Sequence, residues 1–161
     1  RDSSTSRGLG DVYKRQGDIQ LTLSQQVPLT GAVVVTTPQD IALIDAKKGL
    51  RMFQKVNVPI LGIIENMSVF ICPHCGEVEH IFGEGGAKRM SEQYGVPLLG
   101  ELPLSAKIRE QADSGLPTVA AEPDGKEALM YREMAMKVAG ALARITKDYS
   151  AKMPGIRVVN D

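Results

Sequence analysis

The chain has 161 residues, which predicts one domain large enough to bury a core without disulfides or structural metals. Lys and Arg number 19, as do Asp and Glu, so the balanced charge argues against a nucleic-acid partner. No apolar run is long enough for a membrane-spanning helix, and the polar first residues do not resemble a secretory signal. We therefore expect a cytoplasmic protein with neither a nucleic-acid nor a membrane partner.

The two ends of the chain differ in composition from its centre. Residues 1–16 are rich in Ser, Arg and Gly and show no hydrophobic period, so we predict a disordered lead unrelated to the rest of the chain. Residues 149–161 contain Pro and Gly and are predicted to be a flexible tail. The part of the chain that carries the fold is expected to be residues 17–148.

The first elements of this part are a short helix over 19–27 and a strand over 31–36. The β-branched run in the strand is typical of burial on both faces. A helix should come next, with Thr37 as its cap, Pro38 in its first position and Asp40 completing a capping box. The apolar face of that helix is predicted to consist of Leu43, Ala46, Leu50 and Phe53.

The remaining elements continue the alternation of strands and helices. Strands are predicted over 58–64 and 96–100, and helices over 84–94, 105–114 and 125–147. The Gly-rich stretch over 83–86 is interpreted as the entry turn of a helix, because no Lys and Ser or Thr come after it as a phosphate loop requires. The last helix should bury a stripe made of Met130, Met134, Val138, Ala141 and Ile145.

Alternating strands and helices predict an α/β fold with a parallel sheet and flanking helices. With only three or four strands, the sheet looks incomplete. Ligands of such sheets bind outside the carboxyl ends of the strands. That rule places Thr36, Thr37, Glu65, Asn66 and residues 102–104 near any site.

The strongest chemical signal is the motif Cys72-Pro73-His74-Cys75-Gly76. Two thiolates at this spacing can clamp one metal in a tight turn, in which Pro fixes one backbone angle and Gly permits a left-handed one. The sequences on both sides alternate polar and apolar residues, which predicts a β-hairpin with the cysteines at its tip.

Several interpretations of the pair remain open. A redox dithiol would need Cys72 at a helix N-terminus, whereas the residues after the pair are typical of a strand. A zinc site within one chain would need both histidines, and His74 lies inside the loop itself. Two cysteines are half of a four-thiolate site, which a symmetric dimer would complete for zinc or an iron–sulfur cluster. A hairpin without metal is the remaining alternative.

Six motifs in this order resemble the Mrp/ApbC family of iron–sulfur cluster carriers, which are MinD-like deviant P-loop ATPases. The resemblance covers residues 17–144. The motifs are Gly17-Asp-Ile-Gln-Leu-Thr22, Thr36-Thr-Pro-Gln-Asp40, Glu65-Asn-Met-Ser68, Cys72-Pro-His-Cys-Gly76, Phe82-Gly-Glu-Gly-Gly86 and Gly100-Glu-Leu-Pro103.

The resemblance implies a homodimer that holds a four-iron cluster through Cys72 and Cys75 of both subunits. The family passes the cluster to apo-proteins, and ATP with Mg²⁺ gates the transfer. Asn66 corresponds to the family's adenine-contacting asparagine, and Pro103 belongs to the loop that borders the base. Asp18 ends the family's switch segment.

One departure from the family bears on activity. The family's P-loop, a G-K-G-G-x-G-K-S/T string, does not occur in these 161 residues. That loop supplies the amide cradle and the lysine for the phosphates, and positioning of this kind carries nearly all of phosphoryl-transfer catalysis. We therefore expect this chain to correspond to the C-terminal part of a carrier and to hydrolyse no ATP alone, while the intact parent should be an ATPase.

Overall fold

The protein is described by a computed structural model, which covers Thr22, Val27 and residues 29–145. The predictions for the lead over 1–16, for Asp18 and for the tail over 149–161 lie outside the described residues. The helix predicted over 19–27 lies outside them too, apart from two isolated positions.

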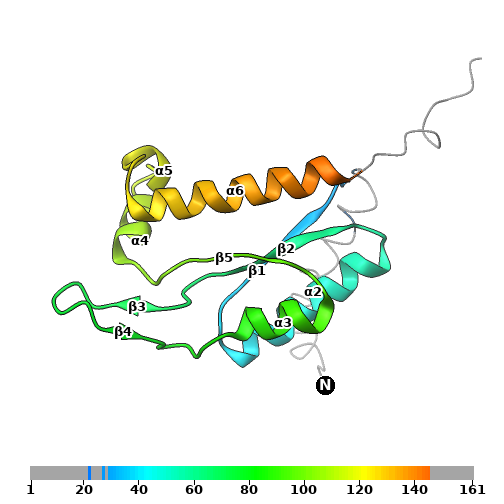
Figure 1. Ribbon diagram of the computed structural model, residues 1–161, viewed down its shortest axis with the longest axis horizontal. Coiled ribbons are helices and arrows are strands. Elements are labelled where there is room, and N and C mark those ends of the chain that lie inside the picture. The colour runs from blue at the N-terminus through cyan, green and yellow to red at the C-terminus, as the bar shows by residue number, and fades with distance from the viewer. Residues whose placement is uncertain (1–21, 23–26, 28, 146–161) are drawn as a thin grey trace, which may run out of the picture.

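A three-stranded parallel sheet forms the centre of the fold (Figure 1), as the alternating pattern predicts. Its strands are β1 Ala32–Thr36, β2 Ile60–Glu65 and β5 Leu98–Glu101. They lie in the order β1, β2, β5, so β1 is an edge strand among the described residues.

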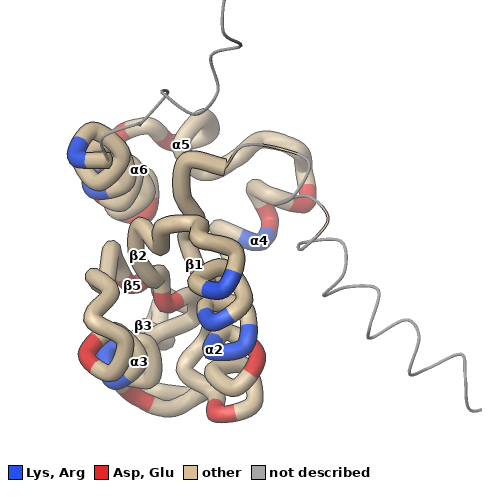
Figure 2. Tube along the Cα trace, turned by 90° about the vertical axis from the view of Figure 1, so that its right-hand side faces the viewer, with Lys and Arg blue, Asp and Glu red and all other residues tan. Residues whose placement is uncertain are grey.

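Helices cover both faces of the sheet, as the end-on view in Figure 2 shows. The main helices are α2 Asp40–Lys55, α3 Gly86–Tyr94 and α6 Lys126–Arg144. Helices α2 and α3 pack on one face, and α6 packs on the other over β5 and β2. No helix among the described residues is long and apolar enough to span a bilayer.

The hydrophobic core lies between the sheet and the pair α2 and α3. Leu50 of α2 and Ile63 of β2 are fully buried, and Met90 of α3 is 1% exposed. The apolar face predicted for α2 is confirmed by Leu43 and Leu50, which belong to this core. Each such side chain stabilises the fold by about 1.5–3 kcal/mol through removal of apolar surface from water.

Strand β1 is less buried than its β-branched sequence predicts. Val34 is 8% exposed, but Val35, on the opposite face, is 59% exposed. Helix α6 packs mainly on β5 and β2, and a cavity separates it from Val33 and Val35 of β1. Burial on both faces is therefore wrong for β1, because a buried strand needs neighbours on each face and the described helices supply them on one only.

The start of α2 also differs from the prediction. The helix begins at Asp40 with Gln39 as its N-cap, and no side chain caps it. The Thr37 hydroxyl instead donates to Gln39 Oε1 at 2.6 Å, and Pro38 precedes the helix. The predicted capping box is wrong because the chain stays extended at Gln39, which places Thr37 two residues too early to reach a helical amide.

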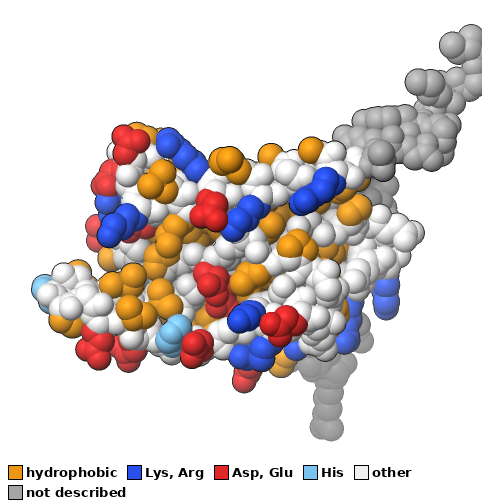
Figure 3. All heavy atoms as spheres, in the orientation of Figure 1, with side chains coloured by type: hydrophobic (Ala, Val, Ile, Leu, Met, Phe, Trp, Pro, Cys, Tyr) orange, Lys and Arg blue, Asp and Glu red, His pale blue; other side chains and the backbone are white. Residues whose placement is uncertain are grey.

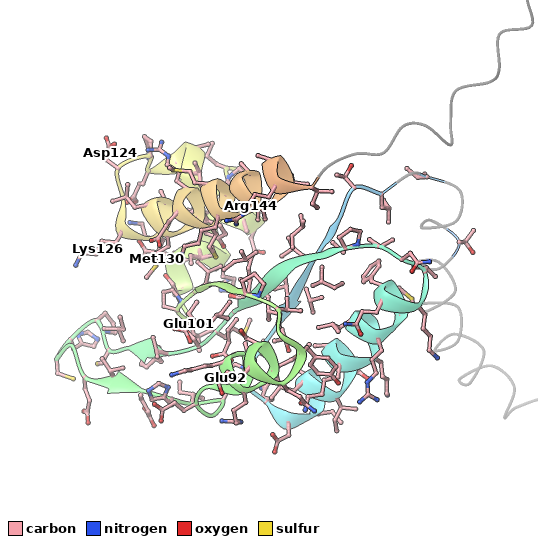
Figure 4. All side chains as sticks on the ribbon, turned by 45° about the vertical axis from the view of Figure 1, so that its right-hand side comes forward. Glu92, Glu101, Asp124, Lys126, Met130 and Arg144 are labelled. Carbon is pink, nitrogen blue, oxygen red and sulfur yellow. The ribbon has the colours of Figure 1, made fainter. Side chains whose placement is uncertain are left out.

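The C-terminal part contains two short helices before α6. Helix α4 spans Ala106–Asp113, close to the prediction, whereas α5, Thr118–Ala121, is not predicted by the sequence pattern. On α6, Met134 is buried as expected. Met130 is 39% exposed (Figure 4), so the prediction that it belongs to the buried stripe is wrong. Tyr131 takes that place on the helix face, since it lines a cavity together with Met134 and Val138.

Candidate functional site

The two cysteines lie at the tip of a β-hairpin that projects from one end of the molecule (Figure 1), as predicted. Strands β3, Phe70–Ile71, and β4, Val78–Glu79, pair antiparallel. At the tip, the Cys72 amide donates to Glu77 O and the Gly76 amide donates to Cys72 O, both at 2.9 Å. Gly76 has φ +75°, a left-handed conformation that glycine adopts without steric cost.

Neither cysteine is enclosed by the fold. Cys72 is half-buried, Cys75 is exposed, and neither forms a disulfide. The pKa of the Cys72 thiol is lowered, first by the hydrogen bond from the Cys75 backbone amide, then by that of His74 and by the Cys75 side chain. Hydrogen bonds of this kind stabilise a thiolate, which is the form that binds metals.

Cys72 and Cys75 are the two cysteines of the sequence. Among the residues that the structure describes, no three His, Cys, Asp or Glu side chains come together as a metal site would require. His74 and His80 are both exposed. Cys72 comes after a strand and opens a turn, so the helix N-terminus that a thioredoxin-like dithiol uses is not at this position.

Apolar side chains surround the hairpin, as Figure 3 shows for the face in view. Ile71 and Val78 are directly opposite each other on the two strands and are 51% and 56% exposed. Ile81, just beyond β4, is 49% exposed. A cluster of half-exposed apolar residues beside a functional group is typical of a surface that another protein covers.

A cavity of about 440 Å³ lies at the carboxyl end of β2, beside the hairpin. It brings together Asn66 and Pro103, two residues that sequence reasoning singled out. Asn66 Oδ1 accepts a hydrogen bond from the Met67 amide at 3.0 Å, which leaves the side-chain NH₂ group to donate to a ligand. Thr36 and Thr37 line a neighbouring cavity that Asn66 also borders.

Seven further residues line this cavity that the sequence does not place near a site, namely Met67, Phe70, Ser105, Ala106, Ile108, Arg109 and Ala112. Phe70 is contributed by the first strand of the cysteine hairpin. Phe70 could have been predicted to lie near a site, because it is an aromatic residue that comes shortly after the end of the parallel strand β2. Ile108 comes from α4, which the sequence predicts without indicating which cavity it borders.

A parallel sheet with helices on both faces and a cavity at its carboxyl edge defines a class of protein, the P-loop NTPase-like α/β domains, which here carries a hairpin with two cysteines. The family model described as ParA, NUBPL iron-transfer P-loop NTPase, matches residues 14–139. The chain belongs to this family, which confirms the resemblance found in the sequence.

Curated relatives carry names that agree with the family. The chain is 60% identical over 132 residues to the iron-sulfur cluster carrier protein of Escherichia coli K12, covering 82% of this chain and 36% of the relative. It is 59% identical over 126 residues to the protein of the same name from Pseudomonas fragi, covering 78% and 44%. Mouse iron-sulfur cluster transfer protein NUBPL is 50% identical over 128 residues, covering 80% and 40%. The chain thus spans less than half the length of these relatives.

Solved structures support the same fold. A nucleotide-binding protein from Archaeoglobus fulgidus in complex with ADP is similar, with a TM-score of 0.58 and 31% identity over 71% of this chain and 45% of that one. The cell division ATPase MinD of Pyrococcus furiosus has a TM-score of 0.54 and 26% identity over 69% and 43%.

Proposed function

We propose that this chain is the cluster-holding part of an iron–sulfur cluster carrier. Two copies would hold one four-iron cluster through Cys72 and Cys75 of each and would pass it to apo-proteins. The observation that carries the proposal is the incomplete set of metal ligands. Among the described residues, one chain offers the two cysteines and no group of three metal-binding side chains. Four thiolates are the usual ligands of such a cluster, so a second copy supplies what one copy lacks.

The surroundings of the cysteines support a homodimer at this place. Ile71, Val78 and Ile81 expose apolar surface to water in the monomer, and a second hairpin packed against them would recover about 25 cal/mol per Å² of that surface. The sulfurs lie at the tip rather than in the interior, so the same contact can bring four of them together.

Nucleotide control is the second part of the proposal. The cavity beside the hairpin would take the adenine of ATP, with Asn66 donating to the base and Pro103 packing against it. Asp18, magnesium and the phosphate cradle would act in the longer protein that the relatives represent. The setting we propose is the cytoplasm, where free thiols such as these persist.

Anaerobic reconstitution with ferrous iron and sulfide tests the cluster. We expect the visible absorption of iron–thiolate charge transfer, about four irons per two chains, and a shift from monomer to dimer on gel filtration. Cys72→Ser and Cys75→Ser should each abolish all three, while His80→Ala, an exposed change near the hairpin, should leave them intact. Stoichiometric zinc without any iron uptake would instead indicate a structural zinc dimer and would overturn the proposal.

A thiol–disulfide oxidoreductase is the second candidate, because the pKa of the Cys72 thiol is lowered. Such an enzyme would reduce a protein disulfide with Cys72 as the nucleophile and Cys75 as the resolving thiol. Turnover of a disulfide substrate that is lost in Cys72→Ser, in protein that takes up no iron, would favour this candidate over the carrier.

A further inference from the structure

The root of the cysteine hairpin is bonded to the loop after β5. The Ser68 amide and the Ser68 hydroxyl both donate to Leu102 O, at 2.9 Å and 3.1 Å. Two residues later the Leu104 amide donates to Val69 O at 2.7 Å, and Phe70 forms a parallel bridge with Leu104. Ser68 is 6% exposed, so these bonds lie in a dry environment where each is costly to lose.

The same short segment also borders the cavity proposed for the base. Asn66 at its start and Phe70 at its end both line the cavity, and Leu104 lines it from the other side. Cys72 lies only two residues beyond Phe70, and its amide bonds within the hairpin. The cavity and the cysteine pair are therefore built on one continuous segment, with Ser68 bonded across to the loop.

Beyond its root, the hairpin has few restraints. Strands β3 and β4 are two residues long each, and Val78 and Glu79 of β4 are exposed. Apart from the pairing of the two strands, the hydrogen bonds that join β3 and its root to the loop after β5 run through Ser68, Val69 and the bridge to Leu104. The hydrogen bonds of the tip, at Cys72 and Gly76, stay within the hairpin. A shift of the root therefore moves the tip with it, because these bonds do not anchor the tip to the rest of the domain.

We propose that Ser68 is a positioning residue that couples occupancy of the cavity to the orientation of the cysteine hairpin. A base held between Phe70 and the loop at residues 103–104 restricts both sides of the bridge and so favours one hairpin orientation over others. An empty cavity leaves the root free to shift and the sulfurs less well placed to meet those of a second copy. This coupling rests on the proposed nucleotide site. Through it, occupancy of that site would influence the orientation of Cys72 and Cys75.

The first test needs no ligand. In a Cys72→Ser background a dye on Cys75 reports hairpin mobility through its fluorescence anisotropy, and hydrogen exchange reports the Leu104 amide. Ser68→Ala should lower the anisotropy and speed exchange at Leu104 about fivefold, the factor expected for loss of one ~1 kcal/mol hydrogen bond. The matched control is Ser91→Ala, which removes a hydroxyl bond of 2.6 Å from α3 to Val96 O and should change neither signal. Equal effects of the two variants, or none from Ser68→Ala, would overturn the coupling.

The second test adds adenosine at millimolar concentration to the chain with unaltered Ser68, so it stands even where Ser68→Ala does not fold. Binding is followed through the NMR signals of the Asn66 side-chain amide, and mobility through the dye on Cys75. Binding with increased anisotropy supports the coupling, and a smaller increase at saturation in Ser68→Ala supports it further. Binding without any change in anisotropy overturns the coupling while the nucleotide site stands. Failure of adenosine to bind overturns the base site, and with it the coupling.

Discussion

Glu65 is expected to hold helix α3 in place, and its replacement should be among the more costly single changes in the protein. The carboxyl group lies at the end of β2, is 1% exposed and accepts a hydrogen bond from the Ala87 amide at 2.5 Å. Gly85, the N-cap of α3, has no side chain to bond a helical amide, so Glu65 supplies the cap from another element.

The magnitude depends on the groups that each substitution leaves unpaired. Glu65→Ala leaves the buried Ala87 amide without a hydrogen-bond acceptor and opens a cavity, so we expect a loss of about 3 kcal/mol of unfolding free energy. Glu65→Gln keeps an oxygen acceptor but loses the favourable charge at a helix N-terminus, so about 1 kcal/mol should be lost. Glu92→Ala, at an exposed position of the same helix (Figure 4), should stay within about 0.5 kcal/mol.

Urea unfolding followed by circular dichroism measures these differences, since the chain has no Trp for fluorescence. The diagnostic result is the order of the three variants, with Glu65→Ala lowest, Glu65→Gln intermediate and Glu92→Ala near the parent. If Glu65→Ala and Glu92→Ala had the same midpoint, the assignment of Glu65 as the cap of α3 would be refuted.

Four further substitutions have expected outcomes in the same assay. Gly86→Ala should cost about 1–3 kcal/mol, because its Cβ would lie 2.9 Å from Pro38 O, in the loop between β1 and α2, whereas Gly140→Ala, with nothing within 4 Å, should stabilise α6 by about 0.5–1 kcal/mol. Leu50→Ala should cost about 2–5 kcal/mol, as expected for a fully buried leucine. The hydrogen bond to Glu122 raises the pKa of Lys107, so the stabilisation from this pair should be fully present at neutral pH and lost only as alkaline pH rises through the raised value. Lys107→Met should therefore be slightly less stable than the parent at neutral pH, and the two stability curves should converge in alkaline solution.

The sheet and main helices could be predicted because their signals are local. The β-branched run at β1 and the apolar period of α2 each identify an element without reference to the rest of the chain. Exposure of Val35 could not be predicted in this way, since it depends on which part of the sheet α6 covers. Helix α5 was missed because four residues are too few to establish a helical period.

The candidate site shows the same division. The cysteine hairpin could be predicted from the spacing of Cys72 and Cys75 and the alternating flanks, and Asn66 from its place after a strand. The bond from Ser68 to Leu102 joins residues 34 positions apart, and no pattern near either residue indicates it. Glu65 likewise caps a helix that begins 21 residues later, so in the sequence it resembles an ordinary strand end.

The placement of the cysteines bears on whether the proposed cluster would be retained or released. Structural four-thiolate sites are closed by the fold around them, and their stability depends on that enclosure. Cys75 is exposed here, and the hairpin around it buries no core residue. A cluster held at such a tip would gain little protection from its own subunit and would depend on the contact between two copies. Loosening the proposed contact would expose all four sulfurs at once, as the proposed carrier function requires if a cluster is to pass to another set of thiolates.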